Sequence, residues 1–286
     1  MAEHEFFEGW YFKHQCAGRT IALIPAHHRH KDGGHQASLQ IITQRQTWYL
    51  PIPAAQFQVE RRPFLVRAGD CTFSLQGLRV DCPLDGGWLT GELRYQNVVP
   101  PRYDIMGPFC AVPGMECRHS VLSLAHRVSG TLRMEGDTMD FTGGTGYIEG
   151  DRGLSFPKRY LWTQCGWGEN CVMLSVADIP FCGGTFIGCI CSVLLEGRER
   201  RLATYTGARV LRVDETGALV RQRDWELEVT LVEARGQRLQ APKGGGMTRT
   251  IHESAACRVR YRLRRGGKAL LDFTGDMASF EAEWIS

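Results

Sequence analysis

The chain has 286 residues, of which 43% are hydrophobic. Its 34 basic and 31 acidic residues leave a net charge of only +3. This length predicts either two domains or one large β architecture with a substantial core. The small net charge argues against nucleic acid as a partner, because nucleic-acid binding needs a concentrated basic face.

No part of the sequence is typical of a membrane or secreted protein. Residues 1–5 lack the positive leader and apolar core of a signal peptide. The longest apolar stretch, residues 181–195, is interrupted by glycines and is shorter than the roughly 20 residues that span a bilayer. We therefore expect a cytoplasmic protein without stable membrane insertion, whose 11 cysteines are reduced thiols.

The first half of the chain predicts strands separated by polar segments. A polar, glycine-bearing loop is expected over residues 27–35, and a short helical turn near residues 53–56. Residues 132–134 and 139–141 alternate around a turn at residues 135–137, which is typical of a β-hairpin.

The second half continues in the same way. Residues 195–198, 214–217 and 265–268 carry the polar and glycine residues of hairpin corners. Residues 225–231 alternate between apolar and polar side chains, as a half-buried strand does. The alternating arginines of residues 258–264 are expected on the solvent side of another strand.

These patterns together predict an all-β fold. A second glycine-bearing loop is expected over residues 242–250. No segment longer than about 12 residues keeps the helical period that a stable helix needs. The 33 glycines and many turn signals favour a barrel or a sandwich of short strands.

Two segments of the sequence resemble the tocopherol cyclase-like family. Residues 6–13, Phe-Phe-Glu-Gly-Trp-Tyr-Phe-Lys, are similar to the family's opening motif. Residues 146–165 resemble its central signature, in which Tyr-x-Glu-x-Asn-Trp-Gly leads into Phe-Pro and then Trp-x-Gln-Cys. This chain departs from the signature at Asp151 and Arg152, which stand where the family has asparagine and tryptophan.

The resemblance implies a fold of two lipocalin-like β-barrel halves packed together. We place the N-terminal half at residues 1–140 and the C-terminal half, with the signature, at residues 141–286. Related proteins include carotenoid hydratases and pericyclic cyclases of polyketides, so the resemblance also implies activity on hydrophobic, often isoprenoid molecules. The two added charges at positions 151 and 152 favour a more polar ligand than the tocopherol precursor.

The signature segment contains the best candidates for catalysis. Tyr147, Glu149 and Asp151 alternate, so an extended backbone places all three on one face. A carboxylic acid in an apolar cavity has a raised pKa and can protonate an alkene or a carbonyl. We expect Glu149 or Asp151 to act as acid or base, with His119 as a proton partner. The open alternative is that both acids pair with basic neighbours and brace the turn.

Further residues are expected to bind the substrate. The aromatic faces of Trp10 and Trp162 would stabilise a developing carbocation, and the guanidinium of Arg118 or Arg152 would hold a polar end of the ligand. Asp178 follows an apolar strand, where a barrel mouth is expected. The full set of expected binding residues is Trp10, Glu116, Arg118, Tyr147, Arg152, Trp162, Gln164, Asp178 and His252.

The sequence predicts neither a metal nor a cofactor. His27, His28, His30 and His35 are close in sequence, but no Cys-x-x-Cys pair accompanies them, and neighbouring histidines rarely converge on one ion. The glycine-rich segments lack the lysine and the strand-to-helix context of a nucleotide loop. No Gly-x-Ser-x-Gly elbow marks a nucleophilic serine.

The sequence therefore favours a cofactor-independent cyclase, isomerase or hydratase. It would act by acid–base chemistry on a small hydrophobic or amphipathic molecule of isoprenoid, quinol or polyketide type. The alternative is a non-catalytic carrier of a lipid or a pigment. A carrier cavity would be almost wholly apolar, with acids at its rim only.

Overall fold

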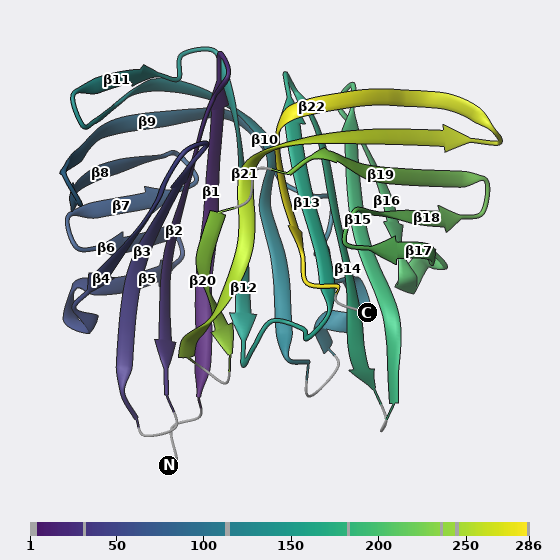
Figure 1. Cartoon of the computed structure of the whole chain (residues 1–286), viewed down its shortest axis with the longest axis horizontal. Coiled ribbons are helices and arrows are strands. Elements are labelled where there is room, and N and C mark those ends of the chain that lie inside the picture. The colour runs from purple at the N-terminus through teal and green to yellow at the C-terminus, as the bar shows by residue number, and fades with distance from the viewer. Residues whose placement is uncertain are drawn as a thin grey trace.

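The computed structural model describes residues 5–30, 33–111, 115–181, 184–234, 237–243 and 246–284, with the backbone alone for residue 181 and for residues 237–254 within these ranges. It is 75% strand and 4% helix, in two nearly closed, barrel-like sheets that lie next to each other (Figure 1). This arrangement confirms the predicted all-β class. Among the described residues, no helix is long and apolar enough to cross a membrane.

The first sheet has the order β4-β3-β2-β1-β12-β10-β9-β8-β7-β6-β5, with β11 paired to β10. The short 3-10 helix η1 (Ala54–Gln56) connects its two end strands at the predicted helical turn, and η2 (Gly107–Ala111) lies between β9 and β10. The strands are β1 (Phe6–Cys16), β2 (Arg19–Arg29), β3 (His35–Thr43), β4 (Thr47–Ile52), β5 (Phe57–Arg61), β6 (Phe64–Ala68), β7 (Cys71–Ser74), β8 (Gly77–Leu84), β9 (Gly87–Val99), β10 (Cys117–Met134), β11 (Asp137–Asp140) and β12 (Gly144–Gly153).

The second sheet has the order β16-β15-β14-β13-β22-β21-β19-β18-β17, with β20 paired to β21. The 3-10 helix η3 (Thr204–Thr206) follows β16. The strands are β13 (Tyr160–Trp167), β14 (Asn170–Phe181), β15 (Gly184–Leu195), β16 (Arg198–Ala203), β17 (Arg209–Asp214), β18 (Gly217–Gln222), β19 (Trp225–Glu233), β20 (Gln237–Lys243), β21 (Gly246–Arg265) and β22 (Lys268–Ala282).

All the predicted hairpin corners are present. Strands end and restart at 134/137, 195/198, 214/217 and 265/268. The two loops expected over residues 27–35 and 242–250 are shorter than predicted, because strands extend into both segments. β2 extends to Arg29 and β3 starts at His35, while β20 extends to Lys243 and β21 starts at Gly246. The polar side chains of these segments favour loops, but backbone hydrogen bonds to neighbouring strands outweigh that local preference.

The division of the chain at residue 140 stays a prediction. The change from the first sheet to the second occurs between Gly153 and Tyr160. Strand β12, which carries Tyr147, Glu149 and Asp151, therefore pairs within the first sheet, between β1 and β10.

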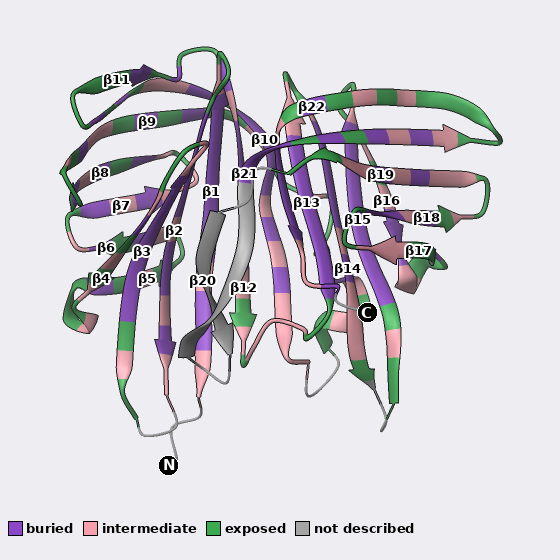
Figure 2. Ribbon diagram, viewed as in Figure 1, coloured by how far each residue is buried: buried purple, intermediate pink, exposed green. Residues whose placement is uncertain are grey.

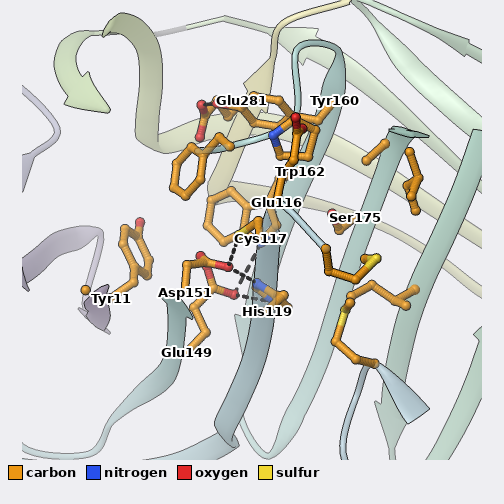
Figure 3. Close-up of a pocket in the computed structure, with 18 of the residues that line it drawn as sticks. Tyr11, Glu116, Cys117, His119, Glu149, Asp151, Tyr160, Trp162, Ser175 and Glu281 are labelled. Atoms are coloured by element: carbon orange, nitrogen blue, oxygen red, sulfur yellow. Dashed lines mark hydrogen bonds and ion pairs between the residues drawn. The ribbon is translucent and has the colours of Figure 1, made fainter. Parts of the chain in front are cut away.

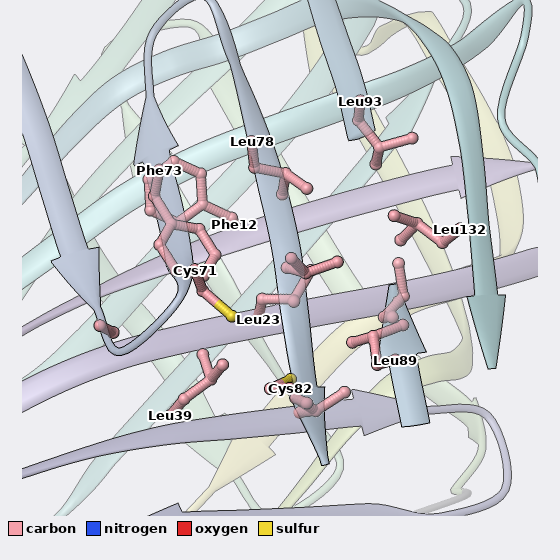
Figure 4. Packing of buried hydrophobic residues seen from close by; sticks show 14 of the residues in the cluster. Phe12, Leu23, Leu39, Cys71, Phe73, Leu78, Cys82, Leu89, Leu93 and Leu132 are labelled. Carbon is pink, nitrogen blue, oxygen red and sulfur yellow. The ribbon is translucent and has the colours of Figure 1, made fainter. Parts of the chain in front are cut away.

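Three apolar clusters account for the packing. One fills the first barrel and one the second, and the third lies between them, with Tyr11, Tyr147 and Trp162 among its members. Figure 2 shows burial to be most continuous along the central strands such as β1 and β13. Figure 4 shows part of the first cluster: Phe12, Leu23, Leu39, Cys71, Phe73, Leu78, Leu89, Leu93 and Leu132.

Strand β1 has no polar, solvent-facing side, because each of its faces packs on a different half. The period of two places Trp10 and Phe12 in the first barrel core and Tyr11 in the cluster between the halves. Lys13 and Gln15 follow Tyr11 on the same face and are also buried.

Polar groups on this second face of β1 hold β22 of the other half. Tyr11 Oη shares a hydrogen bond with Ser279 Oγ at 2.9 Å. Lys13 Nζ donates to Ser279 Oγ and to the Met277 carbonyl, both at 2.7 Å, and Gln15 Nε2 donates to the same carbonyl at 2.7 Å. The buried ammonium thus joins the two halves beside the third apolar cluster.

Candidate functional site

A cavity of about 190 Å³ lies between the two halves. Strands β1, β2, β3, β10 and β12 of the first sheet and β13, β14, β15 and β22 of the second contribute to its wall, together with residues in and around η2. Most of the wall is apolar or aromatic: Phe7, Trp10, Tyr11, Ile24, Ala26, Met106, Phe109, Met115, Phe156, Tyr160, Trp162, Ala177, Ile179 and Ile190.

The two segments that resemble family motifs meet at this cavity. They lie more than a hundred residues apart in sequence, yet β1 and β12 are antiparallel neighbours. Gly9 is opposite Asp151, and Tyr11 is opposite Glu149. On the other side of β12, His119 of β10 is also opposite Asp151. Strand register therefore brings the predicted catalytic residues together.

Three ionisable side chains form what we call the acid–histidine cluster: His119, Glu149 and Asp151 (Figure 3). His119 Nδ1 lies 2.9 Å from Asp151 Oδ1 in a hydrogen bond. Its Nε2 lies 3.3 Å from Glu149 Oε2 in an ion pair that lacks hydrogen-bond geometry. The imidazole is thus held between two carboxylates, one at each ring nitrogen.

Two further donors point at Glu149. The Tyr147 hydroxyl donates to Glu149 Oε2 at 2.5 Å, and Trp162 Nε1 donates to the same oxygen at 3.3 Å. Tyr147 comes from the same strand two residues away, which confirms the predicted shared face, whereas Trp162 comes from β13 of the other sheet. Both halves of the molecule therefore orient this carboxylate.

The electrostatics favour a charged imidazole in an otherwise apolar cavity. Burial alone would lower the pKa of His119, but the carboxylates of Asp151 and Glu149 hold it well above its usual value. The Cys117 thiol, which donates to Asp151 Oδ1 at 3.4 Å, has its pKa raised well above the usual value by burial and by Asp151. Cys117 is therefore a thiol that supports Asp151 and is poorly suited to nucleophilic attack.

This arrangement can move protons. At neutral pH the cluster holds one acidic proton on the imidazolium and offers carboxylate oxygens as acceptors. Because the cavity is mostly apolar, a hydrophobic molecule can lie against a group that both gives and takes a proton. Both acids form their ion pair with His119. The ion pairs of the described residues therefore do not support the alternative, in which arginines or lysines of the signature brace the two acids.

The cavity has a second polar pair, which the sequence did not reveal. The Tyr160 hydroxyl donates to Glu281 Oε1, and both residues contribute to the cavity wall from the second sheet. Burial raises the pKa of Glu281 well above its usual value, and the acidic groups of Glu283, Asp151 and Glu149 add to this. The C-terminal sequence Phe-Glu-Ala-Glu-Trp alternates like a half-exposed strand, so nothing local distinguishes the buried acid.

The other predicted site residues fall into two groups. Trp10, Glu116, Trp162 and Asp178 contribute to the cavity wall. Tyr147, Arg118, Arg152 and Gln164 do not contribute to this wall. Tyr147 donates to Glu149, Arg118 pairs with Asp104 at 2.8 Å, Arg152 is exposed, and Gln164 is buried and donates to Cys171 Sγ. The side chain of His252 lies outside the described residues.

The acid–histidine cluster is also the group of described residues that could hold a metal ion. One donor atom from each of the three lies within 4.8 Å of the others. The two ring nitrogens, however, face different carboxylates, whereas a metal would need one nitrogen and both carboxylates to converge. The observed orientation matches an imidazolium between two anions. His27, in contrast, contacts both His35 and Glu8, and none of these three residues contributes to the cavity wall.

Comparison with known proteins finds solved structures with a similar fold. No protein-family model matches the sequence, and the curated proteins give no match. Three similar solved structures each align with 98% of this chain. A Nitrosomonas europaea protein provisionally designated AttH aligns over 93% of its own length, with a TM-score of 0.55 and 13% identity. Kievitone hydratase from Nectria haematococca aligns over 89%, with a TM-score of 0.56 and 9% identity. CghA aligns over 88%, with a TM-score of 0.59 and 11% identity.

Identity this low carries information about the fold alone, because function depends on the site rather than on the scaffold. The alignments extend over both sheets and so include the cavity between them. The chain therefore has the all-β fold of two packed, lipocalin-like halves.

Proposed function

We propose that this chain is an acid–base enzyme of hydratase, cyclase or isomerase type that acts on a small hydrophobic molecule without a cofactor. The observation that carries the proposal is the acid–histidine cluster at the wall of an apolar cavity. His119 gives or returns a proton, Glu149 and Asp151 accept one, and aromatic side chains hold the apolar body of the ligand.

Three further observations support the proposal. The motifs that resemble the tocopherol cyclase-like family pair with each other at the cavity, and kievitone hydratase is among the proteins with a similar fold. The wall residues Trp10 and Trp162 have the aromatic character that the resemblance implies. We infer isoprenoid, quinol or polyketide-like molecules as the substrate class, because such molecules match an apolar wall with a few polar groups.

The test uses purified protein, a panel of prenylated phenols, quinols and linear polyketides, and water labelled with oxygen-18. A hydratase yields a product that carries the label, and a cyclase or isomerase yields one of unchanged mass but altered retention. Recovery of every bound molecule unchanged would contradict the proposal. It would favour the alternative, a carrier of lipid or pigment that uses the same cavity.

A further inference from the structure

Tyr160 and Glu281 give the cavity a polar group of a different kind from the acid–histidine cluster. Glu281 lies on β22, directly opposite Trp162 of β13, and Tyr160 precedes Trp162 by two residues. Both members of the pair are almost fully buried and form part of the cavity wall. Figure 3 shows them near Trp162, with His119 and Asp151 on a separate part of the wall.

The two polar groups also differ in their partners. A cation lies between the two carboxylates of the cluster, whereas Glu281 accepts a hydrogen bond from the neutral hydroxyl of Tyr160. Among the described residues, the charged groups that raise the pKa of Glu281 are the acids Glu283, Asp151 and Glu149. An apolar wall and acidic neighbours favour the neutral form of a carboxylic acid, which can accept the hydrogen bond of the phenol on one oxygen and still donate its own proton from the other.

We propose that Glu281, paired with Tyr160, is the hydrogen donor that holds and polarises a carbonyl oxygen of the substrate, so that the substrate class is an α,β-unsaturated carbonyl compound with a hydrophobic body. This inference rests on the proposed function and narrows it. A cavity that contains one ionised cluster and one neutral carboxylic acid has separate places for a base and for an acid.

The strength of the acid decides between substrate classes. Protonation of an isolated alkene creates a carbocation and requires a strong acid. A carboxyl group that is reluctant to ionise is a poor source of that proton. It is well suited to a carbonyl oxygen that becomes negative, because a preorganised neutral donor stabilises that charge in a cavity with little water. The pair therefore fits enol chemistry better than cation chemistry.

The reaction balances with water, or with a hydroxyl of the substrate, as the nucleophile. The nucleophile's oxygen bonds to the β-carbon while Glu149 or Asp151 takes its proton. The π electrons of the alkene move to the bond between the α-carbon and the carbonyl carbon, and the carbonyl oxygen takes the proton of Glu281. The resulting enol returns that proton to Glu281, and the cluster delivers its proton to the α-carbon. Water gives a hydrated product, and an internal hydroxyl gives a ring.

The first test asks whether Glu281 is neutral, and it needs no substrate. Infrared difference spectra of the wild type against E281Q at neutral pH should show the carbonyl stretch of a protonated carboxylic acid in the wild type only. E281Q keeps the size and a hydrogen-bond donor, so the fold should persist. A spectrum in which the wild type shows a carboxylate signal at this position would overturn the proposal.

The second test asks whether the pair faces a ligand oxygen. The probes are 2-naphthol, which imitates an enol, naphthalene, and naphthylmethylammonium, which imitates a cation. Wild type should bind 2-naphthol about tenfold more tightly than naphthalene, the size of one good hydrogen bond. E281L should lose this preference, E281Q should keep most of it because its amide donates, and D85N, at an exposed acid outside the cavity wall, should leave it unchanged.

Two outcomes of the binding test would overturn the inference. One is an unchanged preference for 2-naphthol in E281L, which would mean that Glu281 does not reach the ligand. The other is tighter binding of the ammonium probe that is lost in E281L, which would mean an ionised acid facing a cation. Neither readout requires turnover, so failure of the proposed function and failure of this inference are separate results.

Discussion

His126 should make the fold sensitive to mild acid. Its side chain is buried inside the first barrel, where Nδ1 shares a hydrogen bond with Ser123 Oγ at 2.9 Å and Nε2 has no partner among the described residues. Gly146 leaves the space that the ring occupies, since a Cβ there would lie 2.1 Å from His126 Nε2. Burial lowers the pKa of His126 to about 3.

The size and sign of the effect follow from that pKa. The unfolded chain takes up a proton on this histidine near pH 6.5, whereas the folded chain stays neutral until about pH 3. The group therefore contributes fully to stability above pH 6.5, and the contribution falls as the pH drops. Between pH 7 and pH 5 the loss should be about 2 kcal/mol, because one pKa unit corresponds to about 1.4 kcal/mol.

The assay is urea unfolding at pH 7 and at pH 5 for the wild type, H126Q and the control H30Q, which changes a less buried histidine. Loss of stability on acidification should be about 2 kcal/mol smaller in H126Q than in the wild type, while H30Q should follow the wild type. Equal acid sensitivity in H126Q and the wild type would refute the reasoning. It would mean that water or another group satisfies the buried ring.

Three more predictions concern the interface and the site. K13M removes the ammonium that joins β1 to β22, and with it two hydrogen bonds from a charged donor, so urea unfolding should show a loss of about 3 kcal/mol, against almost none for the exposed K268M. G150A places a Cβ 2.7 Å from Trp10 Cδ1, so it should lower the free energy of unfolding by about 1–3 kcal/mol and weaken the binding of an apolar fluorescent ligand. Unchanged affinity would mean that Trp10 does not contact the ligand. Treatment with a chelator should leave the melting temperature unchanged, because no metal centre is expected, and a stoichiometric ion found by elemental analysis of untagged protein would contradict that expectation.

Local sequence was sufficient for the parts of the fold that depend on local geometry. The turn at residues 135–137 and the corners near 196, 215 and 266 contain residues that favour tight turns, and each is a strand junction. Alternation likewise predicted that Tyr147 and Glu149 share a face, because successive side chains of a strand point to opposite sides.

Contacts between distant strands were beyond local sequence. The placement of His119 beside Asp151 depends on the register between β10 and β12, and a shift of one residue would turn His119 away. His27 was expected in a loop, yet it lies on β2 and contacts Glu8 of β1, which is a long-range pair. Glu281 was missed for the same reason, since its burial comes from packing between the halves.

The central claim is that the acid–histidine cluster performs the chemistry, and turnover of E149Q and D151N on an identified substrate tests it most directly. Both variants keep the shape of the side chain and should bind the substrate normally, but each should lower kcat by about 10²–10⁴-fold, the usual contribution of a general acid or base. D85N, at an exposed acid outside both the cavity wall and the cluster, should turn over like the wild type. Normal kcat in E149Q and D151N, with lowered melting temperatures, would show that these acids only brace the structure.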